Sequence, residues 1–446
     1  NIMTLGNDIY EGKYKEEKYQ KYVEAFNNND HNESIINIID ELYDKRTTPL
    51  PEKYHFEQLD KIKIGNKKNS YESFNITNQL CKYYENYNLN HMFIITIYFR
   101  HNTLCQYLNK YNHYEYKLHH YIKFFEVVPR IKEEVYYHYG MLLLHKKKYI
   151  ESCKYIYNIN PVIVEHLNIE PINMSFFREN DKNKTLLIYM SGGLGDNIMY
   201  SRFISKLLDL YVSNKIIFLV YDSLYWIYDF LHKNDNITIV PYKYRDNIKH
   251  FDYHCNVFML FSYLNLDYDD IYFKSYPKQL PFHIMDFKHI LSETKKNIII
   301  NWKGGNQNTH EEYNRKIPLE YLKKVFEIKN VNFICITKDI DDEERLFLND
   351  NNVHYIGSIL DKDDAFRFSG HLMKQVHMVI TTDTSLSHMA GTLDVNVVTL
   401  LTCGCEWRWT HDISTNWYPN MKLLRQIKPF VWDDVIDQLI TTINNQ

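Results

Sequence analysis

Two kinds of hydrophobic pattern divide the chain. From about residue 31 to residue 175, apolar positions recur at helical spacing, and no stretch shows the alternation of a strand. After the polar segment 178–184 (RENDKNK), short apolar runs alternate with helical stretches, as in a parallel sheet with helices on both faces. The sequence therefore predicts an all-α region followed by α/β domains.

The short apolar runs form two groups, which the charged stretch 292–297 (SETKKN) separates. The expected strands of the first group are 186–190, 216–220, 237–240 and 253–260, and those of the second are 297–302, 332–337, 354–357, 377–382 and 395–400. An amphipathic helix is expected over 429–446. We expect two Rossmann-like parallel sheets that face a cleft, with domains at 1–178, 179–293 and 294–446.

The helical region shows signs of a repeat. Two segments end at Pro129 and Pro161, about 32 residues apart, close to the period of about 34 in tetratricopeptide repeats. The second segment resembles such a repeat, because Gly140 would let two helices approach closely and Tyr149 opens the second helix. That second helix is about one turn short for the family. The alternative is an irregular helical cap on the domains that follow.

Composition narrows the classes of function. Of the 446 residues, 45% are hydrophobic and 24% charged, and 52 basic against 56 acidic residues give a net charge of −4. This balance does not favour a nucleic-acid partner or an anionic membrane surface. The longest apolar run, 92–99, is far shorter than the roughly 20 residues of a membrane-spanning helix. The polar N-terminus lacks an apolar signal core, so we expect a cytoplasmic protein.

The seven cysteines are scattered and odd in number, which favours reduced thiols over a disulfide framework. Cys403 and Cys405 form a C-x-C pair, but no second pair or His follows at the spacing of metal ligands. We therefore expect both side chains to pack in a core, and no metal site is predicted here.

The sequence 191–196 (SGGLGD) joins the first expected strand to a helix. Gly192, Gly193 and Gly195 can take backbone conformations closed to other residues and bring the main chain close to a substrate. Asp196 then stands at the start of the helix, where a carboxylate can take part in chemistry. The alternative is an ordinary N-cap, since Asp is among the best capping residues.

A second strand–turn–helix unit lies near the C-terminus. Asp383, Thr384, Ser385 and Leu386 follow the expected strand 377–382 and open the next helix. Backbone N–H groups, hydroxyls and the helix dipole at this point suit a diphosphate, and His388 would add a proton donor or a positive charge. The alternative makes Asp383 a capping residue and His388 a packed core histidine.

Further cations follow strands of the second group. Lys303 stands beside Gly304 and Asn306, where a flexible cation on a Gly-rich turn suits a phosphate, and Arg315 could bind the same group. Both could equally be solvated loop charges. The segment 406–409 (EWRW) follows the last expected strand, and two Trp side chains are costly to expose. We expect this segment to line the cleft or to join the two domains.

These motifs together resemble the heptosyltransferase-type (family 9) glycosyltransferase domain of the GT-B fold, in the branch fused behind tetratricopeptide repeats. The resemblance covers about residues 185–440 and is carried by SGGLGD, NWKGG with Arg315, and DTSLSHMAG followed by WRW and WYP. It implies that Asp196 is the general base and that Lys338 lies where the nucleotide base and ribose bind. The segments 368–377 and 402–406 depart from the family pattern beside the donor pocket.

The sequence thus predicts an inverting, metal-independent glycosyltransferase without a cofactor. Its donor would be a nucleotide-diphosphate sugar and its acceptor a hydroxyl of a glycan or protein, selected by the helices. The D-x-D strings at Asp267/Asp269 and Asp361/Asp363 are weak signals for a metal in a chain with 56 acidic residues. Two alternatives stay open, namely an inactive binding or scaffold protein and another nucleotide-sugar enzyme such as a 2-epimerase.

Overall fold

The structure is a computed structural model that describes residues 129–156, 175–271, 280, 286–305 and 315–445. The helical repeats predicted before residue 129 lie outside these residues, as do Pro161 and Asn306. Residues 133–311, 315–427 and 431–446 form one compact unit that holds both parallel sheets. The domain limits 178/179 and 293/294 stay predictions.

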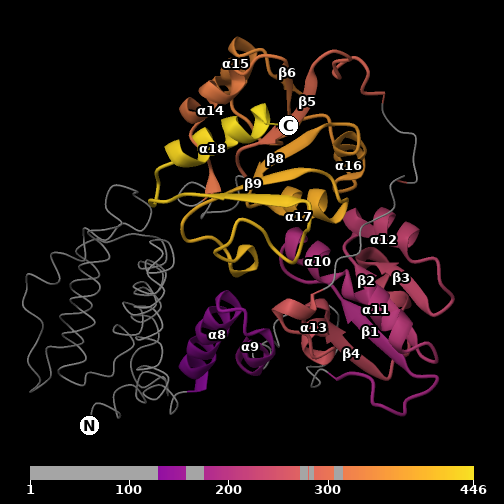
Figure 1. Ribbon diagram of the computed structural model, residues 1–446. Coiled ribbons are helices and arrows are strands. Elements are labelled where there is room, and N and C mark those ends of the chain that lie inside the picture. Colours follow the sequence, from indigo (N-terminus) through magenta and orange to yellow (C-terminus); the bar gives the residue numbers. More distant parts are fainter. Residues whose placement is uncertain (1–128, 157–174, 272–279, 281–285, 306–314, 446) are drawn as a thin grey trace, which may run out of the picture. The chain divides into compact units, whose positions relative to one another are not determined.

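The first sheet has four parallel strands in the order β3-β2-β1-β4 (Figure 1). Its strands are β1 (Thr185–Tyr189), β2 (Lys215–Val220), β3 (Ile237–Pro241) and β4 (Tyr253–Asn256). Helices α10 (Leu194–Tyr200) and α11 (Phe203–Leu210) connect β1 to β2, and α12 (Tyr225–Leu231) follows β2. The pattern of short apolar runs thus predicted β1, β2 and β3 correctly. The expected strand 253–260 is too long, because β4 ends at Asn256 and residues 257–259 form a 3₁₀ helix.

The two faces of this sheet are covered differently. Alternate residues such as Ile188 and Phe218 pack in the large apolar cluster that also contains α10, α11 and α12. On the other face, Leu187, Tyr189 and Leu219 pack with partly buried residues between Ile217 and Phe251. The chain from β3 to β4 crosses this face and contains the short 3₁₀ helix η5 (Tyr242–Asn247). In the described residues, the expectation of helices on both faces is therefore not met here, because this connection is too short for an α-helix.

The second sheet has six parallel strands in the order β10-β9-β8-β5-β6-β7. These are β5 (Lys296–Asn301), β6 (Val331–Cys335), β7 (His354–Tyr355), β8 (Met378–Thr382), β9 (Val397–Leu401) and β10 (Met421–Arg425). Its helices are α14 (Leu319–Phe326), α15 (Asp342–Asp350), α16 (Arg367–Met373), α17 (Ser385–Thr392) and α18 (Asp433–Asn444). The two parallel sheets expected from the sequence are confirmed.

The strands of the second sheet are buried on both faces, which explains their unbroken apolar runs. Ile298 and Ile300 pack with α14, α15 and α18, whereas Ile299 between them joins the large cluster on the opposite face. That large cluster also contains Ile188 of the first sheet and Trp417 near the C-terminus. The two sheets therefore share one apolar core.

A helical hairpin precedes the first sheet. Helix α8 (Pro129–His145) and α9 (Tyr149–Ile156) meet at Gly140, where an added Cβ would lie 2.3 Å from Ile156 Cγ1. This agrees with the close approach expected at that glycine. The backbone N–H of Tyr149 donates to Asp267 Oδ1 at 2.6 Å, and Trp417 Nε1 donates to the Tyr149 hydroxyl at 3.2 Å. The hairpin is thus fixed to both α/β halves.

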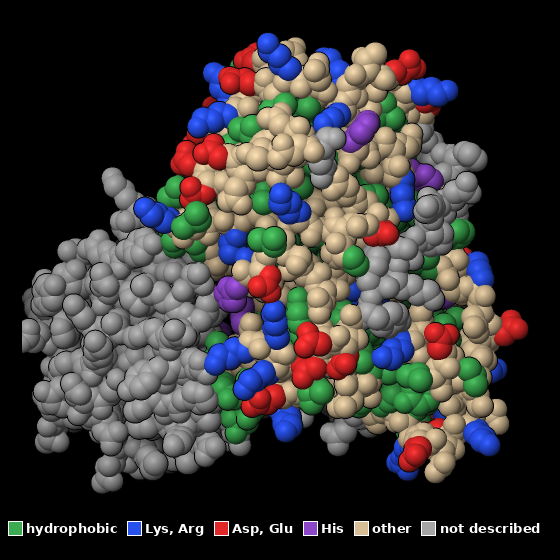
Figure 2. Space-filling view, in the orientation of Figure 1, with side chains coloured by type: hydrophobic (Ala, Val, Ile, Leu, Met, Phe, Trp, Pro, Cys, Tyr) green, Lys and Arg blue, Asp and Glu red, His purple; other side chains and the backbone are tan. Residues whose placement is uncertain are grey.

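Charged side chains of both signs are interspersed on the described face in Figure 2. Within the described part of the chain, no helix is long and apolar enough to cross a membrane. Cys403 and Cys405 are both buried and form no disulfide, which agrees with the expectation that they pack in a core. Neither D-x-D string belongs to a group of three or more metal-binding side chains among the described residues.

Candidate active site

The turn after β1 is shaped by glycine and by a buried amide. Gly192 has a φ of +69°, a conformation that other residues rarely adopt. The amide of Asn197, which is buried, accepts from the Ser191 N–H at 3.0 Å and donates to the carbonyls of Ser191 and Gly193 at 2.6 and 2.7 Å. The Tyr221 hydroxyl donates to the Gly192 carbonyl at 2.9 Å. These bonds hold the turn in one shape.

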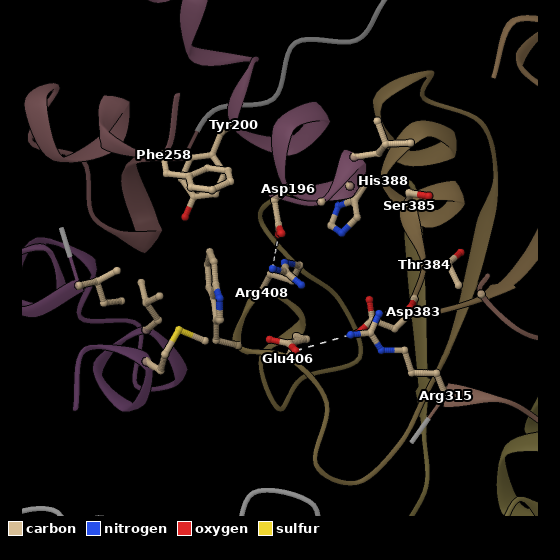
Figure 3. A pocket seen from close by; sticks show the side chains of 18 of the residues that line it. Asp196, Tyr200, Phe258, Arg315, Asp383, Thr384, Ser385, His388, Glu406 and Arg408 are labelled. Carbon is tan, nitrogen blue, oxygen red and sulfur yellow. Dashed lines mark hydrogen bonds and ion pairs between the residues drawn. The ribbon is translucent and has the colours of Figure 1, made fainter. Parts of the chain in front are cut away.

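Asp196 lies in the first turn of α10, and the N-cap of that helix is Gly193 rather than Asp196. The Asp196 carboxylate forms an ion pair with the guanidinium of Arg408, which lies in η9 (Trp407–Trp409). The capping alternative is therefore not what the geometry shows. Instead, the carboxylate points toward a residue 212 positions later in the chain (Figure 3).

The charge of Arg408 is supported by acidic neighbours. Its burial disfavours the charged form, but the carboxylates of Asp196, Glu406 and Asp383 raise the pKa of Arg408 above its ordinary value. Arg408 is 9% exposed. The EWRW segment thus lines the site and joins the two α/β halves, as the sequence indicated.

The turn after β8 is built from hydroxyls and a helix start. Thr384 is the N-cap of α17, and its hydroxyl lies 3.2 Å from that of Thr381. Asn301, the last residue of β5, donates its amide to Thr381 Oγ1 at 3.1 Å and accepts from the Thr337 hydroxyl at 2.8 Å. This polar network joins the carboxyl ends of neighbouring strands and places Ser385 at the positive end of the helix dipole.

Arg315 reaches the same turn from the other side. Its Nη1 donates to the Asp383 carbonyl at 3.0 Å, and its Nη2 lies 3.7 Å from Glu406 Oε1. Figure 3 shows Arg315, Asp383 and Glu406 close to one another, with the Asp196–Arg408 pair beside them. The turn therefore combines a helix N-terminus, hydroxyls and a cation.

His388 lies deeper than expected. Its Nδ1 is 2.8 Å from the Tyr418 hydroxyl, and its ring stacks on Trp409 with centroids 5.0 Å apart. Burial, followed by the charges of Arg408, Arg202 and Arg315, lowers the pKa of His388 well below 6.5. Burial among arginines therefore disfavours the positive charge expected at His388, and the proton donation expected from its ring stays a prediction.

Gly195 explains why His388 and Asp196 come together. A Cβ added at Gly195 would lie 2.6 Å from His388 Cδ2 and 3.2 Å from the Cα of Ser385. The absence of a side chain thus lets α10 of the first sheet pack directly on α17 of the second. Because of this contact, the turns after β1 and β8 face the same cavity.

That cavity has a volume of about 750 Å³. Its lining includes these predicted site residues: Gly193, Gly195, Asp196, Gly304, Arg315, Asp383, Thr384, Ser385 and His388. The sequence therefore singled out residues that line one cavity, although they come from segments far apart in the chain. The catalytic and binding roles of these residues stay predictions.

Other predicted residues do not line the cavity. Lys303 is 6% exposed, and its Nζ forms an ion pair with Glu344 Oε2 at 2.7 Å. Lys338 Nζ donates to the Asp361 carbonyl at 2.7 Å, and Leu386 packs in the large apolar cluster. Gly192 also lies outside the lining and shapes the turn instead.

Several cavity residues were not predicted from the sequence. Arg408 was expected at the cleft but not as the partner of Asp196, since 212 residues separate them. Tyr137 and Met141 come from α8, and Asn256 and Phe258 from the end of β4 and the 3₁₀ helix η6 (Val257–Met259). A polar residue at the carboxyl end of a parallel strand was an available signal for Asn256.

No family model matches this chain, and no curated protein matches it. Among solved structures, it is similar to a glycosyl transferase family 9 protein from Veillonella parvula DSM 2008, with 11% identity, a TM-score of 0.41, and coverage of 59% of this chain and 97% of that one. The E. coli ADP-heptose lps heptosyltransferase II gives 12% identity and a TM-score of 0.39 over 58% and 98% of the two chains. E. coli heptosyltransferase WaaC with ADP gives 11% identity and a TM-score of 0.36, also over 58% and 98%. At these identities and TM-scores, the similarities assign no activity to the chain.

Proposed function

We propose that this chain is a glycosyltransferase of the GT-B type that moves a sugar from a nucleotide-diphosphate sugar to a hydroxyl acceptor. One observation carries the proposal. A single cavity of about 750 Å³ holds a carboxylate, Asp196, from the first α/β half and a helix N-terminus with hydroxyls and a cation from the second. These are the two sets of groups that sugar transfer requires.

The donor diphosphate binds at the start of α17. Ser385 and the first turn of this helix supply backbone N–H groups and the positive end of a dipole, and Arg315 supplies a charge. These groups favour the two negative charges of the phosphates. They also stabilise the nucleoside diphosphate as it leaves, so we propose that neither a metal ion nor another cofactor takes part.

Asp196 acts on the acceptor. Its carboxylate takes the proton of the acceptor hydroxyl while the oxygen of that hydroxyl forms a bond to the anomeric carbon. The bond between the anomeric carbon and the donor phosphate breaks at the same time, and the nucleoside diphosphate leaves with the electron pair. Attack from the face opposite the leaving group inverts the anomeric centre. Arg408 holds the Asp196 carboxylate in position throughout.

His388 has a supporting role in this scheme. Its neutral ring lies between Gly195, Trp409 and Tyr418, so it fixes the contact of α10 with α17 instead of contributing charge. Lys303 supports the second sheet through Glu344. The N-terminal helices select the acceptor in this proposal, which the resemblance to tetratricopeptide-fused enzymes supports.

A thermal-shift screen tests the proposal. The intact chain is heated with UDP, GDP, ADP, CDP and their sugars, with EDTA in a parallel series. We expect one nucleoside diphosphate to stabilise the protein, by about 2.7 kcal/mol at 100 times its Kd, equally with and without EDTA. If none stabilises the protein at millimolar concentration, the proposal fails. Steady formation of a 2-epimer without an acceptor would assign the chain to the epimerase class.

A further inference from the structure

The cavity has two chemically different ends, with the Asp196–Arg408 pair between them. Figure 3 shows Asp383, Thr384 and Ser385 on one side of this pair and Tyr200 and Phe258 on the other. The first side carries the hydroxyls, the helix start and the charges already described. The second side is built mainly from the helical hairpin and from η6, and its lining side chains are Tyr137, Met141, Leu144, Ile156, Phe258 and Met259.

This second end offers almost no polar group to a ligand. Among the described side chains that line it, the polar groups are the hydroxyls of Tyr137 and Tyr200, the amide of Asn256 and the indole N–H of Trp407. The amide of Asn256 is already engaged, because its Nδ2 donates to Ser191 Oγ at 2.6 Å and its Oδ1 accepts from the Phe258 N–H at 2.9 Å. None of the side chains named for this end is charged, and the Asp196–Arg408 pair borders it.

Such a surface discriminates between classes of acceptor. A saccharide carries a hydroxyl on nearly every carbon, and each hydroxyl buried without a partner costs about 1–3 kcal/mol. An alkyl or aryl group instead gains about 25 cal/mol for each Å² removed from water. The apolar end therefore favours an apolar body and disfavours a sugar.

The hairpin also reaches the reacting groups. Loss of surrounding water, followed by the negative charges of Glu406 and Asp196, raises the pKa of Tyr137 above its ordinary value. Tyr137 is thus within electrostatic reach of the carboxylate that is proposed to accept the proton. Tyr137 and Asp196 line the same cavity, so an alcohol bound against α8 can reach Asp196 with its hydroxyl.

We propose that the acceptor is an alcohol whose hydroxyl is carried on an uncharged apolar body, aryl or alkyl, and that this body binds between α8 and η6. The inference rests on the proposed function, because it names the acceptor class of the same site. In the transfer step the alcohol oxygen bonds to the anomeric carbon, its proton goes to Asp196, and the nucleoside diphosphate leaves. The α8–α9 hairpin is then a specificity element and not only a cap.

Binding can be measured without turnover by saturation-transfer NMR on the intact chain. The probes are 4-propylphenol, 1-hexanol, N-acetyltyrosinamide and maltose, each with and without the nucleoside diphosphate found in the thermal screen. We expect 4-propylphenol, 1-hexanol and the phenol ring of N-acetyltyrosinamide to give saturation transfer and maltose to give none. The nucleotide should not displace the alcohols, since it occupies the other end. Stronger binding of N-acetyltyrosinamide would indicate that the acceptor hydroxyl belongs to a tyrosine side chain. Stronger binding of 1-hexanol would indicate an aliphatic alcohol.

Two substitutions locate the binding. Tyr137→Gln changes a side chain that is 45% exposed, so the fold should tolerate it, and Phe258→Gln changes the opposite wall. Each should weaken binding of the alcohols by about tenfold. Tyr244→Gln, at a tyrosine that is 54% exposed and outside the cavity lining, is the matched control and should change nothing.

The outcomes separate this inference from the proposed function. Binding of maltose with no binding of the alcohols overturns the inference while leaving glycosyl transfer intact. Alcohol binding that neither cavity substitution weakens also overturns it, because the alcohols would then bind elsewhere. Alcohol binding at the cavity in a chain that binds no nucleoside diphosphate supports the apolar subsite and rejects the glycosyltransferase.

Discussion

The turns after β1 and β8 both follow the carboxyl end of a parallel strand, yet they carry different chemistry. The first bends at Gly192 with a positive φ, is held by the Asn197 amide, and presents the Asp196 carboxylate. The second contains no glycine and presents Thr384 and Ser385 at a helix start. The two turns thus bring different groups to the same cavity.

This difference suggests a division of work between the halves. The Asp196 carboxylate can receive a proton, whereas the helix start and the hydroxyls of the second turn attract phosphate, although Asp383 of that turn also lines the cavity. The first turn is therefore suited to the acceptor and the second to the donor. Substitutions that affect one turn and spare the other test this division.

Replacement of Asp196 by Asn should have the largest effect. Turnover, measured as release of nucleoside diphosphate, should fall by about 10²- to 10⁴-fold, because the amide cannot take the acceptor proton. Nucleotide affinity should stay nearly unchanged by calorimetry. Asp209→Asn, at an exposed position of α11, is the matched control. Near-normal turnover would show that the base lies elsewhere.

Lys303→Ala should lower the stability of the fold without changing the affinity for the donor nucleotide. Lys303 and Glu344 are both buried, so removal of the lysine leaves a buried carboxylate with the partly exposed Lys316 at 3.3 Å and the Asp341 N–H at 3.0 Å. We expect the free energy of unfolding, measured with urea, to fall by about 3–5 kcal/mol. The nucleotide affinity of the folded protein should stay unchanged. Lys316→Ala should cost less. A stable variant that no longer binds nucleotide would restore Lys303 to the phosphate site.

Arg315→Ala should weaken the second turn selectively. Loss of a charged hydrogen-bond donor should reduce nucleoside-diphosphate affinity by about 1.5–3 kcal/mol in titration calorimetry. Arg315→Lys should retain part of the affinity, because lysine keeps the positive charge but lacks the two parallel N–H donors of a guanidinium. Arg345→Ala on α15 serves as a control outside the cavity. Equal affinities for all variants would place the phosphates away from Arg315.

Two glycines of the first turn should respond for different reasons. Gly195→Ala would bring a Cβ to 2.6 Å from His388 and force α10 away from α17. We expect this to lower the free energy of unfolding by about 1–3 kcal/mol. At Gly192 the nearest atom to an added Cβ is 3.6 Å away, so only the positive φ should destabilise, by roughly 1–2 kcal/mol. Thermal unfolding measures both changes. The reverse ranking would contradict the contact between α10 and α17.

The contact at His388 should also make stability depend on pH. The folded protein keeps this imidazole neutral, whereas the unfolded chain takes up a proton below about pH 6.5. Stability should therefore fall as the pH drops below 6.5. His388 alone should raise the equilibrium constant of unfolding by up to about tenfold for each pH unit. His388→Gln should reduce the slope measured between pH 7 and pH 5. An unchanged slope would show that other groups cause it.

The apolar runs and the turn chemistry were enough to predict most of the two sheets and both turns. The expected strands of the second sheet did not include β10, because Lys422 and Arg425 interrupt its apolar pattern. Lys303 was misjudged because its partner, Glu344, is 41 residues away and no local pattern marks a buried ion pair. The contribution of α8 could not be predicted either, since a helical period does not show which face borders a cavity.

The apolar core shared by the two sheets has a consequence for motion during turnover. Ile188 of β1 and Trp417 near the C-terminus belong to the same cluster, and Arg202 of the first half donates to the Trp417 carbonyl at 2.6 Å. A hinge opening between the halves would expose this cluster to water and break that bond. We therefore expect the two halves to unfold as one cooperative unit, and substrate entry to depend on local rearrangement of loops instead of separation of the sheets.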